Sequence, residues 1–214
     1  VHIVSRCIDS LAIKACADPN MFSLPVPPEG NVDLVVWNGI SAANKPHQQV
    51  GEDWWFEDVS CLRLPFYRRL ILAVESRGMK AETVSSSLMY YAKKYLPLMN
   101  RQAVSSHQVS PGSGTAGSTP SETDQRILLE EIVVLLPNQK GVTPTNFLLG
   151  LLRTAMLLHA SPSCRENLEK KIGSQLDQAV LVDLLIPNMG YSVETLYDID
   201  CVQRILDHFL SANQ

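Results

Sequence analysis

The sequence contains no cysteine pattern that would build a disulfide framework or a metal site. Its five cysteines are scattered over 214 residues, and none forms a CxxC pair or a cysteine–histidine spacing of the zinc-ligand kind. Their odd number and wide separation indicate free thiols in a reducing compartment. These cysteines are Cys7, Cys16, Cys61, Cys164 and Cys201.

A long uninterrupted apolar segment is also absent. Glu130-Glu131 and Arg153 interrupt the longest apolar stretches, so none reaches the length of a membrane span. The first residues, 1–6, lack the basic start, apolar core and small-residue cleavage site of a signal peptide. We therefore expect a cytoplasmic protein that is at most peripheral to the plasma membrane.

The sequence has no concentrated positive charge. The formal net charge is −4 and the sequence pI is about 5.7. Its basic residues occur in scattered pairs, Arg68-Arg69, Lys93-Lys94 and Lys170-Lys171, whereas nucleic-acid binding relies on a clustered basic surface. These observations argue against nucleic acid as a partner.

No segment shows the sustained alternation of apolar and polar residues that marks a β-strand. Apolar residues instead recur at spacings of three to four, and the composition, 45% hydrophobic and 19% charged, is that of an ordinary globular protein. The sequence therefore predicts an all-α domain of stacked helical hairpins. Helices are expected over 2–17, 65–78, 81–96, 127–136, 144–158, 162–173 and 199–210.

Local signals mark several helix ends. Asp53 and Thr143 are expected N-caps, Ser121 opens a capping box, and Ser161-Pro162 is a start signal. Pro65 fits the first turn of the helix that Gly78 is expected to stop, and Gly173 is expected to stop the helix that Ser161 begins. Two further segments, each ending in Pro-Asn, resemble one another and predict two helix ends of similar build. They are 135–138 and 186–188.

Residues 100–121 contain few apolar residues and are rich in Ser, Gly, Thr and Pro, which is typical of a flexible loop. We interpret the chain as a single domain, 1–214. The loop divides it into an N-terminal half, 1–99, and a C-terminal half, 122–214.

The loop carries two motifs. Ser110 and Thr119 each precede proline and are candidate sites of proline-directed phosphorylation, against the alternative of an inert solvated loop. Gly112, Gly114 and Gly117 match the GxGxxG spacing, but no strand precedes them, as a dinucleotide site would require. We therefore expect no bound cofactor.

Several segments together resemble the plant-specific domain of the non-phototropic hypocotyl family of BTB proteins, and the resemblance covers nearly the whole chain. The matching segments follow the same order in this sequence as in the family. They include an aromatic cluster, a helix end with basic and aromatic residues, and a helix start rich in aspartate. The matching segments are 6–12, 53–59, 91–97, 135–187, which includes 147–153 and 161–165, and then 196–200 and 203–206.

This resemblance implies a protein-interaction role. Family members are similar to substrate-recognition adaptors of cullin-type ubiquitin ligases, and some act downstream of blue-light photoreceptor kinases at the plasma membrane, in phototropism, auxin-dependent growth or development. In full-length members an N-terminal BTB domain engages the cullin, and a coiled coil often follows. The present sequence contains neither, so we expect it to hold client or signalling proteins, with a photoreceptor kinase as one candidate.

Four residues are candidate functional positions. Trp54 lies in the densest aromatic cluster, of which we expect two members in the core, and it is a candidate partner contact together with Lys93 and Lys94. The resemblance makes Tyr197 a candidate phosphorylation site, although a structural role for its ring is the preferred interpretation.

Two other function classes stay open at this point. A purely structural spacer would need no exposed binding surface. A cryptic helical hydrolase would need a cleft that joins His159 or His208 to a cysteine and a carboxylate. We predict no catalytic residue, because no nucleophile–base spacing is present.

Overall fold

The computed structural model describes residues 2–17, 51, 53–102, 121–188 and 196–212. Within them the chain is helical, without a β-strand and with one isolated bridge between Pro187 and Tyr197, which confirms the all-α prediction. The elements are α1 (His2–Ala15), α2 (Phe56–Val59), α3 (Leu64–Ser76), α4 (Ala81–Tyr95), α5 (Pro97–Gln102), α6 (Glu122–Leu135), α7 (Thr145–Leu157), α8 (Pro162–Ser174), the 3-10 turns η2 (Leu176–Gln178) and η3 (Leu181–Leu184), and α9 (Ile199–Ala212).

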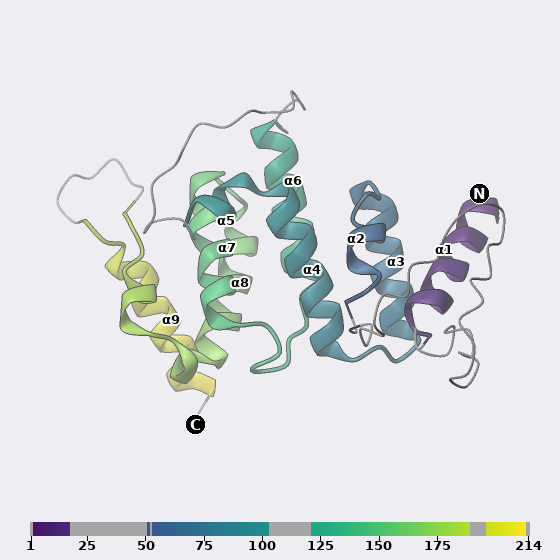
Figure 1. Ribbon diagram of the computed structural model, residues 1–214. Helices are drawn as coiled ribbons and strands as arrows, with labels where there is room; N and C mark the ends of the chain where they lie inside the picture. The colour runs from purple at the N-terminus through teal and green to yellow at the C-terminus, as the bar shows by residue number, and fades with distance from the viewer. Residues whose placement is uncertain (1, 18–50, 52, 103–120, 189–195, 213–214) are drawn as a thin grey trace, which may run out of the picture.

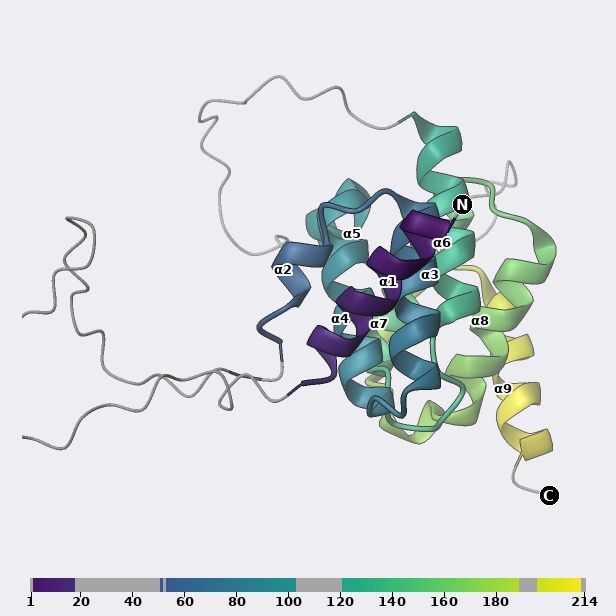
Figure 2. The same ribbon diagram turned by 90° about the vertical axis from the view of Figure 1, so that its right-hand side faces the viewer.

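The helices form a row that begins with α1 and ends with α9 (Figure 1). Along the row α1 packs on α3, α4 contacts α2, α3 and α6, and α8 lies between α7 and α9. A view along the row from α1 places α6 and α8 on one side and α2, α4 and α5 on the other (Figure 2). Each helix is thus buried mainly by its neighbours in the row.

A continuous apolar core runs through the row. It begins with Ile8, Ala12 and Ala15 of α1 and ends with Cys201 and Ile205 of α9. Removing such side chains from water is the main favourable contribution to folding. The largest fully buried side chains are Tyr67, Leu70, Ile71, Leu88, Leu96, Leu129, Ile132, Leu148, Leu149, Leu151, Leu152 and Leu168.

Contacts between the two halves of the chain are polar as well as apolar. The hydroxyls of Ser85 on α4 and Thr143 before α7 are hydrogen-bonded at 2.8 Å, and both residues are buried. Arg68 of α3 forms an ion pair of 2.7 Å with Glu131 of α6. Residues on both sides of the α6 end therefore pack on the segment before residue 100. Residues 100–102, which were expected in the loop, belong to α5, and residues 103–120 lie outside the described residues.

Three expected helix starts are confirmed. The hydroxyl of Ser121 accepts a hydrogen bond from the Asp124 amide at 3.1 Å, and α6 begins directly after it. Ser161 caps α8 in the same way through the Cys164 amide at 3.4 Å. Pro65 lies in the first turn of α3, where its missing N–H costs nothing.

Two expected N-caps are wrong. Asp53 lies in a turn, and α2 begins only at Phe56, with Trp55 at the N-cap and no side-chain cap bond. Helix α7 begins at Thr145 with Pro144 at the N-cap, one residue later than the motif predicts. The Thr143 hydroxyl is buried and bonds Ser85 across the helix interface. The Thr143 hydroxyl thus has its hydrogen-bond partner on a distant helix, and not in the first turn of α7 as the sequence predicted.

Helix ends show one correct prediction and one error. Gly78 follows α3 with φ +84°, and the Met79 amide bonds the Val74 carbonyl at 3.2 Å, which is the Schellman arrangement. Gly173 does not stop a helix, because α8 continues to Ser174. A Cβ at Gly173 would lie 2.6 Å from Cβ of His208 and 3.0 Å from the Ile205 carbonyl oxygen. Glycine is needed there for the close approach of α9.

The expected similarity of 135–138 and 186–188 is also wrong. The first segment follows α6, with Leu136 at the C-cap. The second follows the 3-10 turn η3, and its Pro187 pairs with Tyr197. The Asn188 amide bonds the Leu196 carbonyl at 3.0 Å, so this segment lines up beside the start of α9. An extended pairing has replaced the predicted helix end.

Candidate functional site

The aromatic cluster 54–56 divides between core and surface. Trp55 is 2% exposed and Phe56 is 7% exposed, and their rings meet edge to face with centroids 4.9 Å apart. Trp54 is only partly buried and packs against the outside of the core. Two members thus build the core and Trp54 is the one that reaches the surface.

Helix α4 holds the short helix α2 through three side chains. The Tyr95 hydroxyl donates to the Ser60 carbonyl at 2.7 Å, and the Tyr91 hydroxyl donates to the Leu62 carbonyl at 2.8 Å. The Lys94 ammonium donates to the Ser60 hydroxyl at 2.7 Å and lies 5.7 Å from the Tyr95 ring centroid. Lys94 therefore has a bonding role within the fold, even though its side chain is exposed.

A row of tyrosines supports this contact from inside. The Tyr67 and Tyr91 rings stack at 3.9 Å with an angle of 11°, and Tyr95 follows 4.7 Å from Tyr91. Burial raises the pKa of Tyr67 and of Tyr91 well above the usual value, so both hydroxyls stay protonated. Tyr67 shares a hydrogen bond of 2.8 Å with Ser87. The surface formed by Trp54, α2 and the end of α4, here called the α2–α4 surface, thus rests on a rigid base.

Lys93 is exposed and adjoins this surface on α4, next to Lys94. Trp54 lies in the turn before α2, Lys93 and Lys94 lie on α4, and α2 and α4 are in contact. Whether these residues meet a partner stays a prediction.

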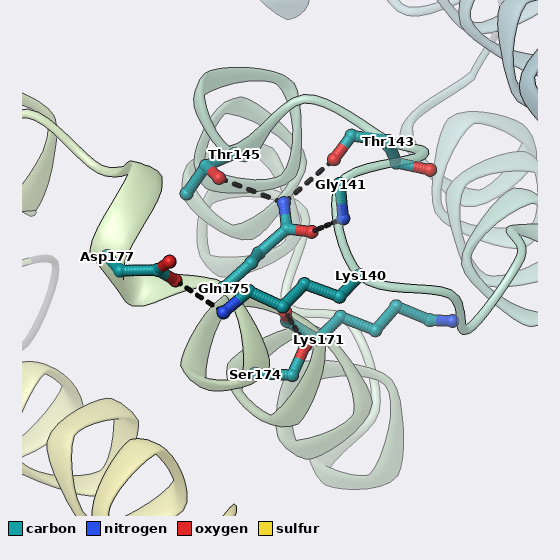
Figure 3. A network of polar contacts seen from close by, with 8 residues as sticks. All are labelled: Lys140, Gly141, Thr143, Thr145, Lys171, Ser174, Gln175 and Asp177. Carbon is teal, nitrogen blue, oxygen red and sulfur yellow. Dashed lines mark hydrogen bonds and ion pairs between the residues drawn. The ribbon is translucent and has the colours of Figure 1, made fainter. Parts of the chain in front are cut away.

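A second polar cluster centres on Gln175, directly after α8 (Figure 3). Its amide nitrogen donates to the Thr143 carbonyl at 2.8 Å and to the Thr145 hydroxyl at 2.9 Å, and its amide oxygen accepts from the Gly141 amide at 2.9 Å. Gln175 is buried, and these bonds satisfy its oxygen and both amide hydrogens. The cluster fixes the turn before α7 against the end of α8. Sequence analysis missed it, because no local pattern links residues thirty or more positions apart.

Two lysines complete the same region. The Lys171 ammonium donates to the Leu136 carbonyl at 2.9 Å and also contacts the Asn138 side chain, so it neutralises the negative end of α6. Burial lowers the pKa of Lys171. Lys140 forms an exposed ion pair of 2.9 Å with Asp177. These groups are engaged in packing α6, α8 and η2 together.

A buried carboxylate joins α8 to α9. Glu169 receives two hydrogen bonds from the Arg204 guanidinium, at 3.0 and 2.9 Å, and the Cys201 thiol lies 3.5 Å from it. The Glu169 side chain is 5% exposed and that of Arg204 is 51% exposed. The bond to Glu169 raises the pKa of Arg204, since it favours the charged guanidinium. Sequence analysis missed this pair too.

The two buried cysteines are poorly suited to nucleophilic chemistry. Burial raises the pKa of Cys201 to about 12 and that of Cys164 to about 11, so little thiolate forms at neutral pH. The described residues also contain no group of three or more His, Cys, Asp or Glu side chains that could hold a metal ion. The arrangement around Cys201 and Glu169 is that of an internal bond network.

The phosphorylation candidates have different outcomes. Ser110, Thr119 and the glycine motif lie outside the described residues. Tyr197 pairs through its backbone with Pro187, and its side chain is 43% exposed. Its ring is therefore accessible, although phosphorylation of Tyr197 stays untested.

No described helix combines the length and the apolar character that crossing a bilayer requires. No solved structure matches the chain.

Curated plant proteins resemble the chain over its whole length. The BTB/POZ domain-containing protein At5g03250 of Arabidopsis thaliana is 56% identical over 100% of the chain, which covers 36% of that protein. The BTB/POZ domain-containing protein At1g30440 is 47% identical, with 33% of its length covered. Root phototropism protein 3 is 32% identical over 96% of the chain and 37% of its own length. The chain thus spans about a third of these Arabidopsis relatives.

A family model also matches residues 53–214, from the turn before α2 onward. The match includes the α2–α4 surface, the Gln175 cluster and the Glu169–Arg204 pair. The chain belongs to the NPH3 family.

Proposed function

We propose that this chain is the protein-binding part of a plant signalling scaffold, of the kind that presents substrates to a cullin-type ubiquitin ligase. The observation that carries the proposal is the family match over residues 53–214, together with relatives whose names include a BTB/POZ domain and root phototropism. In such a scaffold the chain itself holds the client, and a BTB domain elsewhere in the polypeptide contacts the cullin.

The chemistry of the described residues supports a binding role over catalysis. Its buried polar groups hold one helix against another. This is the role of the hydrogen bonds around Gln175, around Glu169 and between Ser85 and Thr143. A catalytic site needs convergent polar groups that stay available to a substrate. The protein therefore acts through its surface.

The α2–α4 surface is the part of the molecule that we assign to the partner. Trp54 supplies an amphipathic ring of the type enriched at binding hot spots, and Lys93 supplies positive charge beside it. The rigid tyrosine row beneath limits the conformational entropy lost on binding. A client fits this combination if its surface has acidic side chains near Lys93 and an apolar depression for the Trp54 ring. A signalling kinase is one candidate.

Proximity labelling in plant cells tests the proposal. The chain is fused to a biotin ligase and compared with Trp54→Ala and with Lys93→Glu, each checked for folding by circular dichroism. Lys170→Glu on α8 is the matched control, since Lys170 is exposed and forms only a local pair with Glu166. We expect a specific set of labelled proteins that Trp54→Ala and Lys93→Glu lose and Lys170→Glu keeps.

Two results would contradict the proposal. A labelled set that is the same for all variants would remove the α2–α4 surface from consideration. A set no different from that of the ligase alone, or turnover of a small molecule by the purified chain, would reject the interaction role itself.

A further inference from the structure

Helix α9 has a buried face and an exposed apolar face. Cys201 and Ile205 are buried against α8, at the place where Gly173 allows close approach. Ile199, Leu206 and Leu210 are 63%, 43% and 58% exposed. With the partly buried Val202 they follow the spacing i, i+3, i+7 and i+11, which forms one stripe along a helix. We call these four residues the α9 stripe.

Further exposed apolar residues lie in the segment that leads into α9. Val180, Leu181 and Val182 at η3 and Leu196 before α9 are all more than half exposed. Figure 1 places η3 at the same end of the row as α9. Scattered exposed apolar residues are ordinary, whereas four apolar residues that share one face of the last helix in the row mark a contact surface.

The position of α9 indicates what kind of contact this is. Helices within the row are covered on both sides, as α8 is by α7 and α9. A stacked helical array stays soluble when its terminal element has a polar outer face. The α9 stripe is apolar, so α9 has the surface of an inner helix of such an array.

The charges beside the stripe add a constraint. Asp200 and Asp207 are seven residues apart, both are exposed, and both border the α9 stripe on one side. Arg204 is turned away toward Glu169, so its charge is neutralised at α8. An occupant that carries Lys or Arg beside its own apolar stripe would therefore be favoured electrostatically.

We propose that in full-length proteins of this family the α9 stripe packs against a further amphipathic helix of the same polypeptide, with basic residues along its flank. About two thirds of each relative's length lies outside the part that this chain covers. A helix on the same polypeptide is present at high effective concentration, which favours it over a separate molecule. The inference is independent of the function proposed above and leaves the α2–α4 surface open to partners.

Hydrogen exchange followed by mass spectrometry tests this proposal. The isolated chain is compared with a chimera in which it replaces the matching segment of the full-length BTB/POZ protein At5g03250, which is 56% identical. We expect the exchange rates of the α9 amides to be at least about tenfold lower in the chimera than in the isolated chain, because covering α9 suppresses its local opening. The double variant Leu206→Asp/Leu210→Asp should lose this added protection, whereas Ile3→Asp, at an exposed apolar site on α1, should keep it.

The natural At5g03250 protein and its own matching segment are measured in parallel, so that a chimera that fails to fold still leaves a comparison. Equal exchange of α9 in the short and long forms would overturn the proposal. Concentration-dependent dimerisation of the isolated chain that Leu206→Asp/Leu210→Asp abolishes, together with equal exchange in the long form, would assign the stripe to a second copy instead.

Discussion

Two residues end helices in the left-handed backbone region, and only one of them is glycine. Gly78 does so after α3, and His159 does so after α7 with φ 50°. The Ala160 amide bonds the Ala155 carbonyl at 2.8 Å, so the end of α7 has the same Schellman form as the end of α3. The left-handed conformation of His159 thus follows from the way α7 ends, and no pattern in the sequence predicted it.

His159→Gly should stabilise the protein by about 1 kcal/mol, because a left-handed conformation costs a non-glycine residue about that much. The imidazole is exposed, so little packing is lost with it. Urea denaturation of both proteins measures the change. His159→Ala is the control and should give no gain, since alanine keeps the strained backbone; a gain of equal size there would reject the explanation.

The side chain of Gln175 joins three groups around the start of α7 to the end of α8. Gln175→Leu keeps its approximate volume but leaves the Gly141 amide and the Thr143 carbonyl without their partner. We expect a loss of about 2–3 kcal/mol in the free energy of unfolding, the usual cost of stranding buried polar groups. Chemical denaturation should show this loss, while Gln139→Leu, in the same turn but exposed, should change stability little.

At the scale of elements, the contact between α8 and α9 joins two opposite kinds of interaction. Gly173 provides a close steric fit, and Glu169 provides a buried charge that needs Arg204. Since Glu169 is almost fully buried and Arg204 is half exposed, the two members are unequal. Removing the arginine leaves a buried carboxylate unpaired, whereas removing the carboxylate leaves an arginine that water can solvate.

Arg204→Ala should therefore destabilise the protein by about 2 kcal/mol at pH 7. This loss is smaller than the loss from breaking a fully buried ion pair, because Arg204 is half solvated. In the variant the buried Glu169 carboxylate loses both guanidinium hydrogen bonds, so the loss comes from an unpaired buried charge. Glu169→Gln in the Arg204→Ala background removes that charge and should recover part of the stability.

Denaturant titrations of the parent, the single variant and the double variant at pH 7 measure these changes. No recovery in the double variant would mean that lost packing, and not the charge of Glu169, explains the loss. Lys170→Ala breaks the exposed pair with Glu166 and should cost no more than about 0.5 kcal/mol.

At the scale of the whole molecule, the helical body extends beyond the family match. The family model covers residues 53–214, yet α1 buries Ile8, Ala12 and Ala15 against α3. The Arg69 guanidinium also donates to the Ser5 hydroxyl at 2.9 Å. Helix α1 is therefore a structural part of the same body.

Ala12→Asp on α1 should destabilise the protein by about 2 kcal/mol or more, because it places a carboxylate in a fully buried position against α3. Ile3→Asp, on the exposed side of the same helix, should have almost no effect. Thermal and urea denaturation distinguish the two. Equal behaviour of the two variants would mean that α1 is not part of the cooperative unit.

The sequence by itself determined the all-α class and many of the helix ends, because these depend on local chemistry. Proline fixes its own φ at Pro65, hydroxyls cap the nearest amides at Ser121 and Ser161, and Gly78 accepts a left-handed turn. In the aromatic cluster it also gave the number of buried rings, since three neighbours cannot share one helix face.

Only the tertiary structure decided the use of residues whose partners are far along the chain. The Thr143 hydroxyl bonds Ser85 and does not cap α7. Gly173 lies inside α8 and allows the close approach of α9. Glu169 is paired with Arg204, thirty-five positions later in the chain. Local signals compete with such contacts, and a buried polar group or a close helix crossing outweighs a preference worth about 1 kcal/mol. Which side of α9 stays exposed was decided in the same way, by how the helices pack.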